Sequence, residues 1–200
     1  MGQEDKTART APYRGLRVQL IQLICHAFLS LSGWKMRGDW PDVKKAVLLA
    51  APHTSNWDGI YMLAAAGYYR IGLRWMGKQS LTTGPFGGLI RALGCVPIDR
   101  SASHDLVQSM SQAIVASSDM LLLVPPEGTR SLTAVWKTGF YQIAKQAAVP
   151  IIVTVLDYGT RTICVADVFH PTQDIDTDMI QLKAYYANAV GKHRAQFSAA

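Results

Sequence analysis

Residues 44–52 read KKAVLLAAP, a short and continuous apolar run with lysines before it and a proline after it. A run of this form, without alternating polar residues, is typical of a β-strand buried on both faces of a parallel sheet. Two later runs have the same form, MLLLVPP at residues 120–126 and PIIVTVL at residues 150–156. The three runs therefore predict central strands of one buried sheet.

Stretches with a helical pattern lie between these runs. Residues 57–69, 104–117 and 140–147 carry apolar side chains at spacings of three and four. That spacing places them on one face of a helix. Strands that alternate with helices predict an α/β fold, with a central, mostly parallel sheet flanked by helices.

The length and composition favour one domain. The chain has 200 residues, of which 49% are hydrophobic, and it contains no internal repeat and no linker rich in proline or serine. A chain of this size suffices for one substantial core and is short for two. We expect a disordered lead-in at residues 1–13, which mix both charge signs without an apolar core, followed by a single domain at residues 14–200.

The net charge of +6 favours anionic partners such as an acidic lipid headgroup or a phosphorylated substrate. Nucleic acid is disfavoured, because the basic residues are scattered and no run interleaves them with aromatics. The cysteines, Cys25, Cys95 and Cys164, form no CxxC pair. This argues against a disulfide framework and a zinc site, and it favours a reducing compartment. The histidines show no metal-ligand spacing, so we expect no metal.

The N-terminal segment, residues 14–36, predicts a membrane-associating helix. Residues 18–34 contain no Asp, Glu, Lys or Arg, and basic residues lie on both sides of them. Gln19, Gln22 and His26 recur at helical spacing, so one stripe is polar. This pattern is typical of an amphipathic helix in the membrane interface, with its basic ends on lipid phosphates. The alternative is a core helix that packs on the domain.

Two polar clusters directly follow two of the predicted strands, HTSNWD at residues 53–58 and EGTRS at residues 127–131. In open α/β sheets, ligands usually bind beyond the carboxyl ends of the strands. Ser55 or Asn56 can cap a following helix, which would place Asp58 in its first turn and near His53. A carboxylate beside an imidazole suits general-base catalysis. The alternative is a surface histidine beside a capping aspartate.

The second cluster also suits an anionic ligand. Gly128 lets the backbone approach a ligand, and Arg130 adds a forked donor group that fits phosphate. Arg100 holds a similar place after the short apolar run at residues 94–98. Either turn alone fits a surface ion pair, but both together with the histidine and aspartate indicate a site for an anionic substrate.

Four sequence blocks, in order, resemble the glycerolipid (1-acylglycerol-3-phosphate type) acyltransferase family, and in particular a compact bacterial branch. The first block is HTSNWD, in which a histidine and an aspartate are separated by four residues. The second contains GK, PFG and LGCVPIDR within residues 77–100. The third is PEGTRS at residues 126–131, and the fourth is VPII at residues 149–152. The resemblance runs over most of the chain.

The resemblance implies a role for each matching residue. His53 would be the general base that deprotonates an acceptor hydroxyl, and Asp58 would orient and polarise it. Attack on a thioester would then be direct, without an acyl-enzyme. The residues expected to bind the acceptor and its phosphate are Arg100, Glu127, Gly128, Thr129 and Arg130. Lys78 and Lys137 are candidates for the phosphates of the acyl donor, with a solvated surface lysine as the equal alternative.

The expected reaction is acyl transfer from acyl-CoA or acyl-carrier protein to the hydroxyl of a lysophospholipid or a glycerol-phosphate-like acceptor. No cofactor is expected beyond this co-substrate. Membrane lipids are the expected partners, at the inner, cytoplasmic face of the cell membrane. One alternative is a thioesterase or lipid hydrolase in which His53 activates water, and another is a non-catalytic lipid-binding module. Pro125 and the segment CVPI at residues 95–98 depart from the usual family pattern, which leaves the acceptor open.

Overall fold

The computed structural model describes residues 15–98, 103–133 and 135–199, and its centre is a mostly parallel sheet. The strand order is β1-β7-β6-β2-β5-β3-β4, and each neighbouring pair is parallel except β6 and β7. The strands are β1 (Lys35–Arg37), β2 (Lys45–Ala51), β3 (Leu73–Lys78), β4 (Cys95–Ile98), β5 (Met120–Val124), β6 (Ile151–Asp157) and β7 (Thr162–Phe169). The α/β fold predicted from the apolar runs is confirmed.

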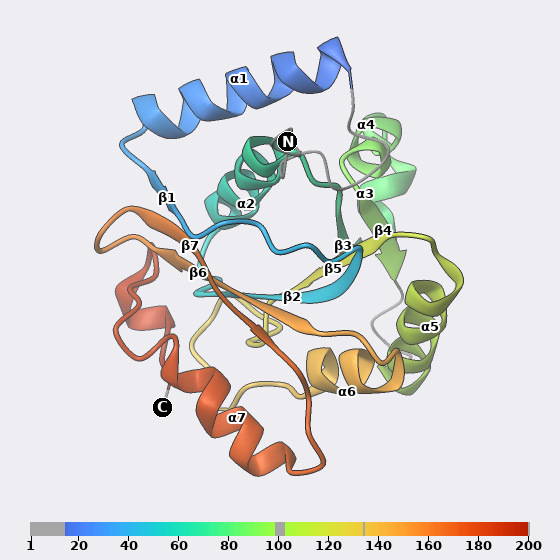
Figure 1. Cartoon of the computed structure of the whole chain (residues 1–200). Coiled ribbons are helices and arrows are strands. Elements are labelled where there is room, and N and C mark those ends of the chain that lie inside the picture. The colour runs from blue at the N-terminus through green and yellow to red at the C-terminus, as the bar shows by residue number, and fades with distance from the viewer. Residues whose placement is uncertain (1–14, 99–102, 134, 200) are drawn as a thin grey trace, which may run out of the picture.

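Helices cover both faces of the sheet (Figure 1). They are α1 (Leu16–Leu31), α2 (Asn56–Tyr69), α3 (Gln79–Thr83), α4 (Gly87–Ala92), α5 (Ser103–Ala116), α6 (Gly139–Gln146) and α7 (Ile175–Ala184). α1 and α2 lie over one face, and α6 and α7 lie over the other. The helices predicted from apolar spacing correspond to α2, α5 and α6. The predicted lead-in at residues 1–13 lies outside the described residues.

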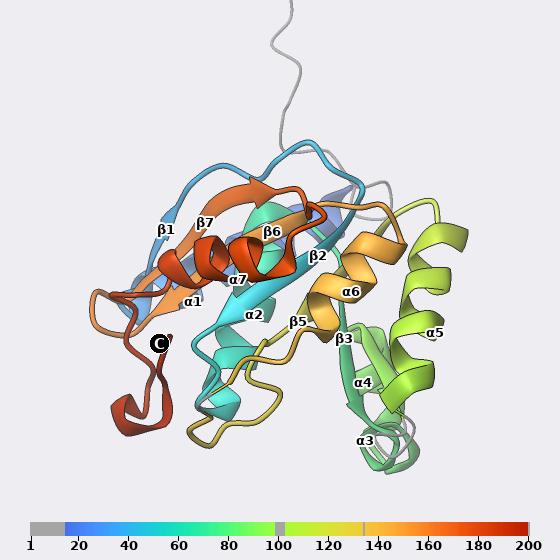
Figure 2. The same cartoon turned by 90° about the horizontal axis from the view of Figure 1, so that it is seen from below.

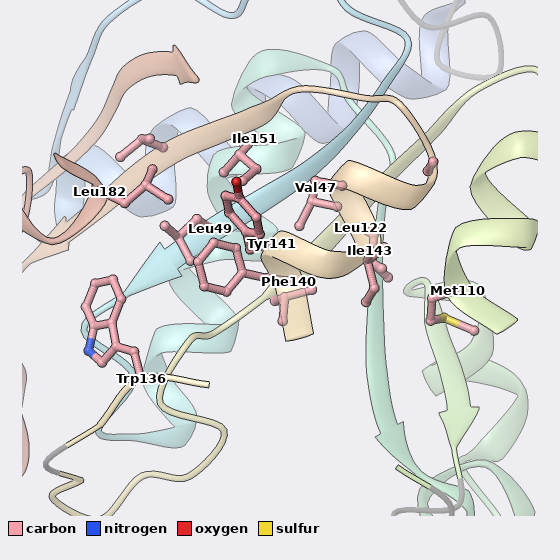
Figure 3. Packing of buried hydrophobic residues seen from close by; sticks show 14 of the residues in the cluster. Val47, Leu49, Met110, Leu122, Trp136, Phe140, Tyr141, Ile143, Ile151 and Leu182 are labelled. Atoms are coloured by element: carbon pink, nitrogen blue, oxygen red, sulfur yellow. The ribbon is translucent and has the colours of Figure 1, made fainter. Parts of the chain in front are cut away.

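The central strands are mostly apolar because both of their faces are buried. Val47 and Leu49 of β2 face α6 and α7, where they pack with Phe140 and Tyr141 (Figure 3). Leu48, which points to the opposite face, packs beneath α2. The side chains of a strand alternate between its faces, so a strand covered on both faces has few polar positions. This burial fixes the register of β2. It therefore also fixes where β2 ends and where the following residues leave the sheet.

α1 packs on α2 through apolar residues such as Leu29 together with Gln22 and Cys25, and it keeps a second apolar face outside. Gln22 donates from Nε2 to the Tyr68 carbonyl oxygen at 2.9 Å, and the ring of His26 meets the Tyr68 ring edge-on. Cys25 fills the space where a side chain at Gly67 would lie, which lets the two helices approach closely. The outer face consists of exposed residues Leu16, Leu20, Leu23, Ile24 and Leu31. Among the described residues, no helix is long and apolar enough to cross a membrane.

Candidate active site

The site begins where β2 ends. A cis peptide bond joins Ala51 to Pro52, and His53 follows. Ser55 is the N-cap of α2, and its hydroxyl accepts a hydrogen bond from the Trp57 N–H at 3.2 Å. Asp58 completes a capping box, because its carboxylate accepts the Ser55 N–H at 2.7 Å. The expected helix cap is therefore confirmed, and it folds the Asp58 side chain back toward His53.

Asp58 is fixed by four groups. Its Oδ2 accepts the N–H groups of Thr54 and Ser55, at 2.6 and 2.7 Å, and lies 3.4 Å from His53 Nδ1. Its Oδ1 accepts the Tyr158 hydroxyl at 2.7 Å. The Asp58 side chain is 3% exposed, whereas that of His53 is 27% exposed. The carboxylate thus orients one nitrogen of a ring that a substrate can still reach.

The hydrogen bonds to Asp58 also determine its charge. Burial by itself would raise the pKa of Asp58, but the hydrogen bonds from His53, Tyr158 and the Ser55 N–H outweigh burial and lower this pKa. Asp58 is therefore a carboxylate at neutral pH. Burial and the hydrogen bond to Asp58 together raise the pKa of Tyr158, so its hydroxyl stays a donor. A charged carboxylate beside an imidazole ring is the arrangement that general-base catalysis by histidine uses.

Tyr158 has no role in the sequence-based prediction, although the structure places it at the centre of the site. It lies 100 positions from Asp58 in the chain and reaches it because β6 is the neighbour of β2. Its ring also packs edge-on against the ring of Trp34, with 4.8 Å between the two ring centroids. The only sequence signal was its position just after a buried strand, and that signal does not name a partner.

Glu127 joins the loop after β5 to the loop after β2. Its Oε1 accepts the backbone N–H of His53 at 2.8 Å, and the residue is 3% exposed. Its Oε2 is buried and has no hydrogen-bond partner among the described residues. Burial raises the pKa of Glu127, an effect that its backbone hydrogen bonds oppose. Glu127 therefore supports the backbone at His53, a contact that the sequence did not predict.

The other predicted binding residues of the second cluster lie beside Glu127. Gly128 has φ of 63°, and a Cβ there would lie 2.9 Å from Lys137 Cδ, so a larger residue would be strained and would displace Lys137. Thr129 and Arg130 are exposed. The structure thus brings Gly128, Thr129, Arg130 and Lys137 together at one turn.

Lys78, a predicted donor contact, is not brought to this turn. Lys78 is exposed at the end of β3, which is separated from β2 by β5. Arg100 lies outside the described residues. Figure 2 shows the loops after β2 and β5 at the same edge of the sheet, near the chain that follows α7. The carboxyl edge is where the sequence placed the ligand site.

The fold and this edge define an α/β protein with a histidine beside a buried aspartate, next to the turn that carries Gly128, Thr129, Arg130 and Lys137, which we call the basic turn. The acyltransferase family model matches residues 35–156. This match covers more than half of the chain, and the chain therefore belongs to the acyltransferase family. The family that the four sequence blocks predicted is confirmed.

Individual relatives agree with the family. The chain is 34% identical over 113 residues to the 1-acyl-sn-glycerol-3-phosphate acyltransferase of Streptococcus pneumoniae, which covers 56% of this chain and 42% of the relative. It is 30% identical over 145 residues to a probable 1-acyl-sn-glycerol-3-phosphate acyltransferase of Mycoplasma pneumoniae, which covers 68% and 54% of the two chains. The chain thus spans about half the length of the curated relatives it matches.

A solved structure shares the fold. It is the 1-acyl-sn-glycerophosphate (LPA) acyltransferase PlsC of Thermotoga maritima, with a TM-score of 0.58 and 15% sequence identity. The match covers 84% of this chain and 76% of that chain. At this identity, the likeness supports the fold of the sheet and its helices.

Proposed function

We propose that this chain transfers a fatty acyl group from acyl-CoA or acyl-carrier protein to the hydroxyl of a lysophospholipid or glycerol-phosphate acceptor. The observation that carries the proposal is the His53–Asp58 pair, in which a buried, charged carboxylate orients a partly exposed imidazole. The names of the relatives point to 1-acyl-sn-glycerol-3-phosphate as the first acceptor to test.

The proposed reaction uses His53 as a proton carrier. Nδ1 faces Asp58, so Nε2 is the nitrogen that takes the proton of the acceptor hydroxyl. The acceptor oxygen then attacks the thioester carbonyl directly, and the tetrahedral intermediate expels the thiolate. The thiolate takes the proton back from Nε2, which restores the neutral ring and releases the thiol. No acyl-enzyme forms.

The exposed basic side chains of Arg130 and Lys137 at the basic turn support a site for anionic substrate groups. We propose that Arg130, with Arg100, holds the acceptor's phosphate, and that Glu127, Gly128 and Thr129 shape the acceptor pocket. We propose Lys78 and Lys137 as contacts for the phosphates of the donor. Lys137 lies against Gly128 and is exposed, so its ammonium group is available beside the acceptor residues.

Thiol release from long-chain acyl-CoA tests the reaction. In detergent or lipid, we expect release to rise at least about tenfold when 1-acylglycerol-3-phosphate is added, because the acceptor hydroxyl replaces water as the nucleophile. Acyl-carrier-protein donors are measured in parallel, with a panel of other lysophospholipids. Equal release with and without every acceptor would identify a thioesterase. Lipid binding without release from any donor would identify a non-catalytic module.

The outer face of α1 supports a peripheral position at the inner face of the cell membrane. Its leucines and Ile24 repeat at helical spacing and are all exposed, with Leu31 at 89% and Leu16 at 84%. A continuous apolar helix face of this kind suits the boundary between headgroups and acyl chains. The net charge of +6 adds attraction to anionic lipids.

Vesicle binding checks this position. Replacing Leu20, Leu23 and Ile24 with Gln should lower binding to phosphatidylglycerol vesicles by at least about a hundredfold, because burial of each such side chain contributes about 1.5–3 kcal/mol. Cosedimentation measures the bound fraction. Ile180→Gln is the matched control, since Ile180 is 71% exposed on α7 across the sheet. Equal binding by the triple variant and wild type would exclude α1 as the membrane contact.

A further inference from the structure

The chain that follows α7 returns to the active site. We call residues 186–197 the C-terminal strap. Its first residue, Tyr186, is 1% exposed and donates from its hydroxyl to the Leu49 carbonyl oxygen at 2.8 Å. The Tyr186 ring packs edge-on against the ring of Trp136, with 5.2 Å between the two ring centroids. These contacts anchor the strap between β2 and the segment after the basic turn.

The middle of the strap holds Tyr158. The N–H of Tyr158 donates to the Val190 carbonyl oxygen at 2.8 Å, and the N–H of Val190 donates to Asp157 Oδ1 at 2.9 Å. Tyr158 is the residue whose hydroxyl donates to Asp58. The strap therefore fixes the backbone that carries one of the groups around the carboxylate.

The end of the strap holds Thr54, the residue after His53. The N–H of His193 donates to Thr54 Oγ1 at 3.2 Å. With its nitrogen turned toward the two carbonyl groups, the side-chain amide of Gln196 donates to Thr54 O at 3.1 Å and Arg130 O at 2.9 Å. The Thr54 N–H already binds Asp58. Each of the three polar groups of the buried Thr54 thus has a hydrogen-bond partner, and residues of the strap supply two of these partners.

Gly191 lets the strap approach the loop after β2 closely. A Cβ at Gly191 would lie 2.7 Å from Thr54 Cγ2, 3.0 Å from Thr54 Oγ1 and 3.3 Å from Pro52 Cβ. Contacts below 3.0 Å require movement, and the nearest atoms belong to a short, buried side chain. Any larger residue at this position therefore pushes the strap away from Thr54.

We propose that the C-terminal strap is a positioning element of the active site, which keeps His53 aligned with Asp58 by fixing Thr54 and Tyr158. The inference rests on the proposed function, and it adds residues that lie beyond the segment matched by the family, residues 35–156. Misplacement of a catalytic group by about 1 Å can cost about a hundredfold in rate. The strap also joins the loop after β2 to Arg130, so it aligns the base with the basic turn.

A size-compensation experiment tests the strap. Gly191→Ala should lower kcat by about tenfold or more, because the added methyl group displaces Thr54. KM should change by less than about twofold, as expected when an aligned transition state is lost. In a Thr54→Ser background, which lacks Cγ2 and keeps the hydroxyl, the same change should lower kcat by less than about threefold. A strap that merely stabilises the fold would lower the melting temperature and leave kcat of the folded enzyme unchanged.

A side-chain variant tests the same contact without adding a methyl group. Gln196→Ala should lower kcat by about threefold to tenfold, because it frees the Thr54 and Arg130 carbonyl groups. Gln181→Ala is the matched control, because Gln181 is exposed on α7. Amide hydrogen exchange of residues 53–58 should be several-fold faster in Gln196→Ala than in the control.

The two readouts separate the strap from the reaction. Exchange does not depend on turnover, so wild-type exchange at residues 53–58 in both Gly191→Ala and Gln196→Ala would overturn the strap proposal even if wild type transfers no acyl group to any acceptor, a result that would refute the proposed function alone. Wild-type kcat in the folded Gly191→Ala and Gln196→Ala proteins would also overturn it, because a strap that only stabilises the fold can still change exchange. Faster exchange with a reduced kcat supports it.

Discussion

His53→Ala should lower kcat/KM for acceptor-dependent thiol release by about a hundred- to ten-thousandfold, the usual contribution of a general base. The substitution removes the ring but keeps the local backbone, because Glu127 binds the N–H of His53 and not its side chain. Asp58 also keeps its hydrogen bonds from Thr54, Ser55 and Tyr158. The loss should therefore be catalytic, with the fold intact.

Three measurements make this prediction sharp. Thiol release gives kcat/KM, circular dichroism gives the fold, and thermal unfolding should show a change of only a few degrees, because the other hydrogen bonds of Asp58 remain. His170→Ala is the matched control, because His170 is exposed beyond the end of β7. Full acceptor-dependent turnover by a folded His53→Ala protein would exclude His53 as the base.

The central strands were predictable because they are buried on both faces. β2, β5 and β6 are largely buried on both faces and carry few polar side chains, so each is an almost continuous apolar run. β7 is half-exposed and alternates less clearly, and β1 has only three residues, so neither had a distinct pattern. The antiparallel pairing of β6 and β7 depends on a tight turn and not on either strand's composition.

The candidate site was predictable where its contacts are local. His53 and Asp58 are five positions apart, and the capping of α2 brings them together through geometry that the chain encodes in one turn. The contact between Tyr158 and Asp58 spans 100 positions, and that between His193 and Thr54 spans 139. Those contacts follow from the strand order and from the path of the chain after α7, and no short motif reports either.

Asp58→Asn should lower kcat/KM at least about a hundredfold, and up to about ten-thousandfold, the loss seen when the carboxylate of a catalytic triad becomes an amide. The amide oxygen can still accept the Thr54 and Ser55 N–H groups, and its nitrogen can donate to the Tyr158 hydroxyl oxygen. The helix cap therefore survives. The negative charge that stabilises the imidazolium of His53 is lost.

The pH dependence of unfolding separates the loss of charge from a loss of structure. In wild type, the folded pKa of Asp58 is below its unfolded value, so the unfolded chain binds the proton first. The stability from this carboxylate is fully present above the unfolded pKa of about 3.9, and it is lost as pH falls toward the folded pKa. Asp58→Asn has no proton to bind at this position, so the difference in unfolding free energy between the proteins should change as pH falls below about pH 4. Urea titrations at these pH values measure it, and parallel curves down to pH 3 would mean that the pKa of Asp58 is not lowered by folding.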